Sequence, residues 1–106
     1  MKLSNNQILR LSFVIGTLAE EKMEGKFKFK FYKFSKQVEA EAKPIIKTLD
    51  TTESGYIENT ESNIEILNVE QEVDLLTFTE EELATLPLSL ADIEAFEPLI
   101  KEDING

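Results

Sequence analysis

The strongest constraint on the fold is an apolar stripe in the N-terminal half of the chain. It runs from Phe27 to Leu49 in steps of three and four residues, the spacing of one face of an α-helix. Its seven positions are Phe27, Phe31, Phe34, Val38, Ala42, Ile45 and Leu49. The stripe predicts one long helix over residues 26–49. A kink is expected at Pro44, which lacks the amide hydrogen that a helix interior uses.

An alternating run at the start of this stripe allows a second interpretation. Residues 26–31 read Lys-Phe-Lys-Phe-Lys-Phe, which is typical of an edge strand with Lys on its outer face. A strand over 26–32 followed by a helix is therefore the alternative. The two interpretations differ at Phe29, which shares a face with Phe27 and Phe31 in a strand but lies off the stripe in a helix.

A shorter helix is predicted ahead of this element, over residues 5–23. Ser4 and Asn5 are both favourable N-cap residues, and Gly25 provides a stop. The apolar positions at helical spacing are Ile8, Leu11, Val14 or Ile15, and Leu18. Together with the long helix, this element predicts an antiparallel helical hairpin over residues 5–49.

The middle of the chain is polar, and the strongest strand signal follows it. Residues 50–62 are rich in Thr, Ser, Glu and Asn and predict a mobile connection with a hairpin tip near Gly55. A short element of unassigned type follows at Ile64, Ile66 and Leu67. A strand is predicted over residues 72–78, where apolar Val73 and Leu75 alternate with Glu72 and Asp74.

Two capping boxes near the C-terminus predict two short helices. Thr79 with Glu82 opens the first, and Ser89 with Asp92 opens the second. The connecting phrase Leu86–Leu90 is apolar for a loop, so we expect it to be anchored to the core.

The predicted fold is therefore α+β and mostly helical, with a short β element and two small C-terminal helices packed on the hairpin. We expect a single domain, 1–106, divided into the hairpin 5–49, a variable connection 50–62, the β element and short helices 63–100, and a frayed tail 101–106. The predicted core is Ile8, Leu11, Ile15, Leu18, Phe27, Phe31, Phe34, Val38, Ile45, Leu49, Val73, Leu75, Leu83, Ile93, Phe96 and Leu99.

Composition excludes several classes of function. The chain has no Cys and no His, so disulfides, zinc fingers, a Cys nucleophile and a His base are excluded. Its four glycines are too scattered to cradle a phosphate, and no pair of acids stands out as a catalytic pair. Glu80–Glu82 suit the first turn of a helix and lack the spacing of a calcium loop. We therefore expect no catalytic residue, metal or cofactor, and no enzyme.

The composition also predicts that the chain is neither disordered nor a membrane-spanning protein. Hydrophobic residues make up 42% of it, which is far above the content of disordered acidic tails. No apolar stretch approaches the roughly 18 residues of a membrane span, and no secretory leader is evident.

Charge is divided unequally between the two halves. Residues 1–50 hold ten Lys or Arg against six Asp or Glu, whereas residues 51–106 hold one Lys against fifteen acids. The halves therefore carry net charges of +4 and −14 within the overall −10. Pairing with the N-terminal half neutralises only a fraction of the acids, so the surplus predicts a surface for a basic partner.

These charges predict a binding protein whose partner is a protein with a basic surface. The candidate partner-binding residues, on and after the predicted strand, are Glu70, Glu72, Asp74, Glu80, Glu81 and Glu82. Nucleic acid is disfavoured because the net charge repels it. The Lys residues interleaved with Phe27–Phe34 are interpreted as solvated flanks of a core helix. The pattern indicates no oligomeric state.

Several packing phrases resemble a known set of proteins. These are Leu3-Ser4-Asn5, the helix through Leu18, Tyr32-Lys33-Phe34 with Glu39–Lys43, and Ile93-Glu94-Ala95-Phe96-Glu97-Pro98-Leu99-Ile100. Together they resemble small uncharacterised proteins of tailed bacteriophages, which have a helical N-terminal half and a similar Leu-Glu-Pro-Leu-Ile phrase. The resemblance does not extend over residues 50–70 and carries over no active site.

The resemblance implies a phage or prophage origin and hence the cytoplasm of a bacterial host. For a small acidic phage protein, the expected function is to bind and regulate or inhibit a host complex, such as a defence or nucleic-acid-processing complex. The alternative is a structural or assembly accessory of the virion.

Overall fold

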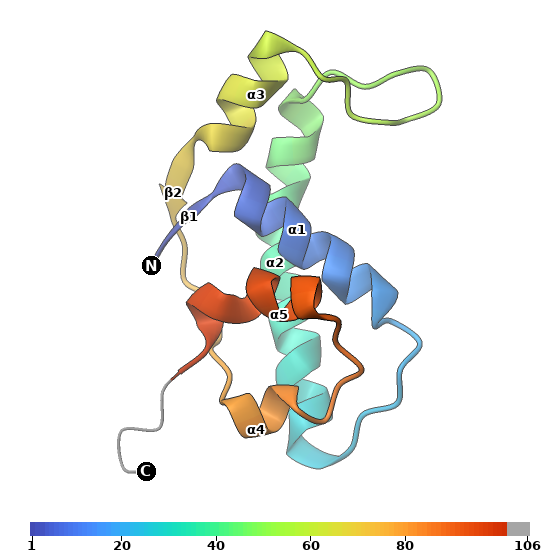
Figure 1. Ribbon diagram of the computed structural model, residues 1–106, viewed down its shortest axis with the longest axis vertical. Helices are drawn as coiled ribbons and strands as arrows, with labels where there is room; N and C mark the ends of the chain where they lie inside the picture. The colour runs from blue at the N-terminus through green and yellow to red at the C-terminus, as the bar shows by residue number, and fades with distance from the viewer. Residues whose placement is uncertain (102–106) are drawn as a thin grey trace.

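The computed structural model describes residues 1–101, and its longest element is helix α2 (Gly25–Thr48), seen behind the other helices in Figure 1. The long helix is thus confirmed, and the alternative strand over 26–32 is wrong. The helix is continuous through Pro44. Six of the seven stripe positions are buried, namely Phe31, Phe34, Val38, Ala42, Ile45 and Leu49.

Helix α1 (Asn5–Thr17) crosses α2 obliquely and runs in the opposite direction (Figure 1). Ser4 caps it in a capping box with Gln7. The predicted end at residue 23 is wrong, because α1 ends at Thr17. Residues 19–24 are mostly charged and supply almost no apolar side chains to hold a further turn against α2.

Gly25 begins α2 instead of closing α1. Its φ of +63° lies in the left-handed region, which is accessible to glycine without strain. The chain therefore reverses direction over residues 18–24 and enters α2 through this glycine.

Strands β1 (Lys2–Ser4) and β2 (Glu70–Glu72) form a two-stranded antiparallel sheet, with Leu3 opposite Gln71. The strand predicted over 72–78 is wrong in extent. Pairing is limited to three residues because β1 ends at Ser4, where α1 begins. Beyond it the chain stays extended, and the Leu76 amide donates to Gln37 Oε1 at 2.9 Å.

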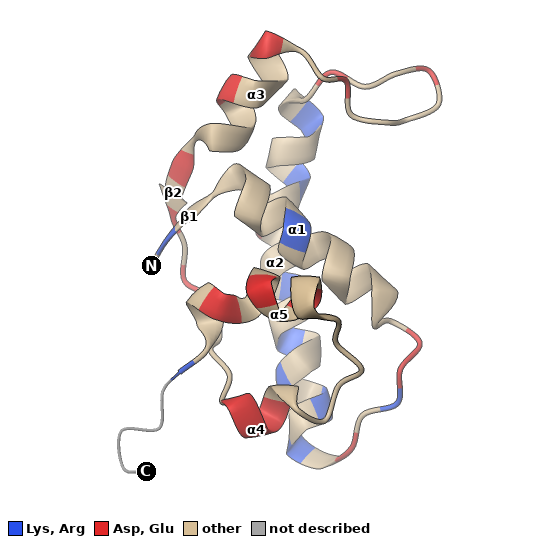
Figure 2. Cartoon of the chain, in the orientation of Figure 1, with Lys and Arg blue, Asp and Glu red and all other residues tan. Residues whose placement is uncertain are grey.

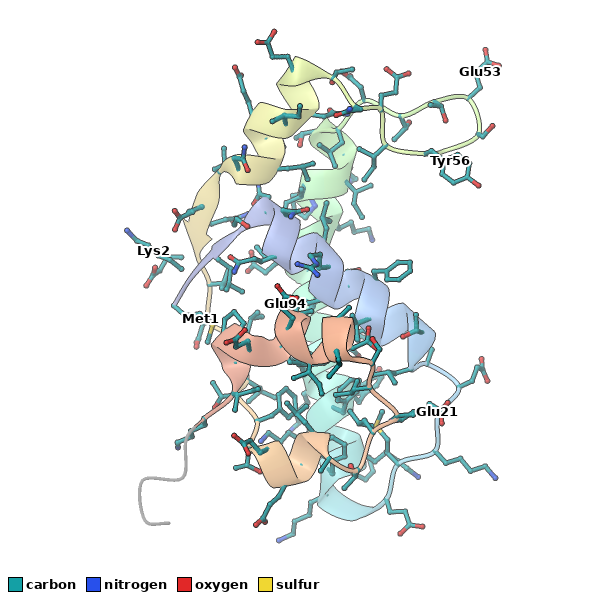
Figure 3. The ribbon with its side chains drawn as sticks, in the orientation of Figure 1. Met1, Lys2, Glu21, Glu53, Tyr56 and Glu94 are labelled. Carbon is teal, nitrogen blue, oxygen red and sulfur yellow. The ribbon has the colours of Figure 1, made fainter. Side chains whose placement is uncertain are left out.

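The segment between α2 and β2 forms a hairpin followed by helix α3 (Glu61–Asn68). Thr51 and Ile57 make an antiparallel bridge, and Gly55 at the tip has a φ of +87°. Glu53 and Tyr56 project from this hairpin into solvent (Figure 3). The short element of unassigned type is therefore a helix.

Both capping boxes are confirmed. Thr79 opens α4 (Glu80–Leu83), and Ser89 opens α5 (Leu90–Phe96), which continues into the 3-10 turn η1 (Glu97–Leu99). In Figure 1, α4 lies near the beginning of α2, and α5 lies beside α1. Residues 102–106 of the predicted frayed tail lie outside the described residues.

The core is centred on aromatic rings from both halves of the chain. Phe34 and Phe78 are edge to face with ring centroids 4.9 Å apart, and Phe31 and Phe96 complete the cluster. Phe78 is absent from the predicted core, yet it is fully buried. Three predicted core residues differ: Ile15 and Phe27 are half-buried, and Ile93 is 43% exposed. Ile93 faces outward because Ala95, Phe96 and Leu99 anchor this segment.

Candidate functional site

The acidic residues singled out in the sequence fall into two groups, and the first lies on and after β2. In the sheet register, Glu72 lies opposite Lys2 and Glu70 lies opposite Ser4. Paired residues share one face of a sheet, so these side chains point the same way. Both acids are exposed on that face, whereas Leu3 on the other face is buried in the core.

Asp74 extends this group beyond the sheet. It lies between Val73 and Leu75, which are buried, so the alternation of an extended chain turns the Asp74 carboxylate outward. Within the group, Glu72 alone has a cationic partner in the described structure, the Met1 ammonium at 3.5 Å. That pair is largely exposed and adds little to stability.

The second group is the first turn of α4. Glu80 and Glu81 are exposed there, and their negative charge is favourable beside the helix N-terminus. Glu82 differs from both, because its carboxylate accepts a hydrogen bond from the Thr79 amide at 2.9 Å. The same carboxylate pairs with Lys30 of α2 at 2.9 and 3.0 Å.

These contacts also affect the ionisation of Glu82. Partial burial raises its pKa, but the hydrogen bond from Thr79 and the charge and hydrogen bond of Lys30 lower it more, so the pKa lies below its ordinary value of 4.5. The ammonium of Lys30 lies 4.7 Å from the centre of the Phe78 ring. Glu82 therefore links α4 to α2, and its carboxylate already has an ion-pair partner, Lys30, and a hydrogen-bond donor, Thr79, within the chain.

The two acidic groups lie at separate places on the surface. Figure 2 shows the acids of β2 and those of α4 with α5 between them, and α5 itself carries Asp92 and Glu94. Within residues 1–101, no cluster of carboxylates has the arrangement needed to hold a metal ion. The acidic side chains therefore attract cationic groups over a broad area of the surface instead of at one compact site.

An apolar groove lies beside the second group, at the phrase Leu86–Leu90, which the sequence also offers as an alternative interface. It lies between α4 and α5 and has a volume of about 460 Å³. Its lining is Glu80, Leu83, Ala84, Leu86, Leu88, Ile93 and Ile100. The sequence signal for it is the apolar phrase Leu86–Leu90, whose Leu86 is buried and whose Leu90 is 87% exposed. Anchoring of this phrase is therefore confirmed at Leu86 but not at Leu90.

A second hollow of about 720 Å³ lies between the end of α1 and the first half of α2. Leu18, Met23 and Phe31 contribute apolar side chains to it, and charged residues of both signs, such as Glu21 and Lys28, surround them. Because the two signs are mixed, this hollow does not select for a charged ligand.

Comparison with family models, curated proteins and solved structures finds no match for this chain. Among the helices of residues 1–101, none combines the length and apolar character required to cross a bilayer.

Proposed function

We propose that the chain is a non-catalytic binding protein whose partner is a protein with a basic surface. The contact residues are the exposed acids of the β2 group and of α4, namely Glu70, Glu72, Asp74, Glu80 and Glu81. The observation that supports this most directly is the lack of cationic partners within the described residues for all of these acids except Glu72. Glu82 is left out of the contact set because Lys30 and Thr79 occupy its carboxylate.

The structure leaves most of the negative charge available to a partner. Of the eight Lys residues between Lys22 and Lys47, Lys30 reaches an acid of the C-terminal half in the described structure, and Lys36 pairs within its own helix. Exposed acids on one flank attract a basic surface over distances comparable to the Debye length, about 8 Å at physiological salt. Association is then fast and sensitive to ionic strength.

The biological setting that we propose follows from the resemblance to tailed-phage proteins. In that setting, the chain occupies the basic surface of a host defence or nucleic-acid-processing complex in the bacterial cytoplasm. Its carboxylates take the place of phosphates there and thereby inhibit or regulate the complex.

The experiment compares two charge-reversed variants. A host protein is captured from bacterial lysate on the immobilised wild-type chain and purified, and its affinity for each variant is measured against ionic strength. The test variant replaces with Lys the residues Glu70, Asp74, Glu80 and Glu81. The matched control carries the same change in net charge on the hairpin and α3, at Glu53, Glu58, Glu61 and Glu65.

We expect the test variant to bind more weakly and with a smaller salt dependence than the control. Four exposed pairs worth about 0.2–1 kcal/mol each, or about 0.8–4 kcal/mol together, would lower the affinity by a factor of between about 4 and several hundred at low salt. Equal affinities and equal salt dependence for wild type, test and control would show that the acidic flank is not the contact surface.

A further inference from the structure

Helix α2 carries a second stripe on the face opposite its apolar stripe. Lys26, Phe29, Lys33 and Lys36 follow one another in steps of three and four residues, and Lys43 and Lys47 continue the same face further along. All six side chains are exposed. We refer to these six residues as the basic stripe.

The basic stripe points away from the rest of the molecule. α1, α5 and the segment around Phe78 pack on the other side of α2, where its apolar stripe lies. Figure 2 shows α2, with its Lys positions, behind the acidic positions of α5, while the acids of β2 and α4 lie to one side of α2. The basic stripe therefore lies on a side of α2 that α1 and α5 do not cover.

The basic stripe also contains an unpartnered aromatic ring. Phe29 is 69% exposed, and Lys26 and Lys33 lie about one turn before and one turn after it on the same face. Transfer of an exposed ring of this size from water into an apolar site is favourable. Ammonium groups on either side of the ring form charge-assisted hydrogen bonds with nearby carboxylates.

The groove between α4 and α5 has the complementary chemistry. Its lining is apolar at Leu86, Leu88 and Ile93, and Glu80 stands at its acidic side with Glu81 as the next residue. Neither carboxylate has a cationic partner among the described residues.

We propose that this groove binds the basic stripe of a second copy of the chain. Phe29 of one copy enters the groove of the next, and Lys26 and Lys33 on either side of it pair with Glu80 and Glu81. This self-association goes beyond the proposed function, since it requires no other protein.

A second copy fits the basic stripe better than a nucleic acid does. The net charge of −10 repels a polyanion and a second copy alike, but the groove of a second copy also offers an apolar floor for Phe29 beside two carboxylates. The stripe cannot pair with another basic stripe about a two-fold axis, because like charges would face each other.

A single stripe-to-groove contact leaves the groove of one copy and the stripe of the other free. Association therefore continues head-to-tail to rings or open chains unless the two contacts close on each other as a two-fold dimer. Repeated copies of this kind suit the alternative function of a virion accessory.

The test uses analytical ultracentrifugation of the full chain at low and high salt, with charge-swapped variants. For the wild type, we expect the average mass at low salt to rise with concentration above that of the monomer and to fall on adding salt. Lys26→Glu with Lys33→Glu, and separately Glu80→Lys with Glu81→Lys, should each give a monomer. A mixture of the two variants should associate again, because both of its interfaces then join opposite charges.

Phe29→Asp provides an independent arm, with Phe13→Asp as its matched control. Phe13 is 74% exposed and lies on α1, outside the basic stripe and the groove. We expect Phe29→Asp to weaken association about tenfold and Phe13→Asp to leave it unchanged. Circular dichroism of each variant verifies that it is folded.

Three results would overturn the inference. These are a wild-type chain that stays monomeric at low salt, a mixture of charge-swapped variants that does not associate, and a chain that binds single-stranded oligonucleotide through its basic stripe without self-associating. Self-association as expected, together with equal partner affinities for the wild type, the acid-reversed test variant and its control, would instead count against the proposed function alone.

Discussion

Helix α2 and the helices of the C-terminal half are stabilised in different ways. α2 has 24 residues, no side-chain hydrogen bond at its N-cap Glu24, and a proline in its interior. α4 and α5 have four and seven residues, and each begins with a complete capping box. The longest helix therefore lacks the side-chain N-cap on which both short helices depend.

The difference follows from what each helix can bury. The apolar stripe of α2 contacts the core along most of its length, so packing outweighs the missing cap and the missing amide of Pro44. α4 is anchored mainly by Leu83, and a single anchor does not offset the unpaired amides of a first turn. A helix with a continuous apolar stripe tolerates an uncapped N-terminus, whereas a helix of one turn requires a capped one.

The largest expected effect comes from breaking the stripe of α2. Phe31→Asp places a carboxylate in the aromatic cluster, where Phe31 is 5% exposed and lies 5.7 Å from the Phe34 ring, and should lower the free energy of unfolding by several kcal/mol. Phe29→Asp, two residues earlier, should change it by less than about 0.5 kcal/mol because the side chain is exposed. Urea denaturation measures both, and equal losses would contradict the role of the stripe.

The sequence predicted the parts of the fold that depend on local pattern. The α2 stripe and both capping boxes are periodic or short-range signals, and the structure confirms them. β1 was missed because three residues are too few to show alternation, and its partner strand lies far along the chain. Phe78 was missed because its burial depends on rings from α2 that only the folded chain brings near.

For the candidate site, the sequence located the acids but not their neighbours. The pairing of Glu82 with Lys30 joins residues far apart in sequence, so no local pattern predicts it. A partial signal was present, since a Glu at the third position of a capping box already uses its carboxylate. The apolar groove beside Glu80 required the packing of α4 against the segment near Ile93, which periodicity does not determine.

A smaller effect is expected from removing a cap. Thr79 Oγ1 accepts a hydrogen bond from the Glu82 amide at 3.1 Å, so Thr79→Ala should destabilise the chain by about 1 kcal/mol. Ser35 lies inside α2 and bonds its hydroxyl to the Tyr32 carbonyl of the preceding turn. Ser35→Ala should therefore be neutral or slightly stabilising, because alanine is the better helix former. Thermal denaturation compares the two, and a similar loss from both would show that α2 depends on local bonds as α4 does.

The smallest effect is a pH dependence carried by Glu82. Its pKa is lower in the folded chain than its ordinary value of 4.5, so its ionised form stabilises the fold. This stability is fully present above the unfolded pKa and is lost as the pH falls through the lower, folded pKa. Glu82→Gln keeps the side-chain shape but removes the charge, so its deficit relative to wild type should be largest near neutral pH and should shrink below about pH 4.

Glu81→Gln is the matched control, because Glu81 is exposed and lacks an ion pair within the described residues. Urea denaturation across acidic and neutral pH should show a larger pH-dependent deficit for Glu82→Gln than for Glu81→Gln, because Glu82 pairs with Lys30. Lys30→Met should lessen the pH dependence at Glu82, since it removes the cation that lowers the pKa of this carboxyl. If Glu82→Gln instead lost no stability at any pH, the capping hydrogen bond, which Gln also accepts, would be the entire contribution of this side chain, and its charge would not hold α4 against α2.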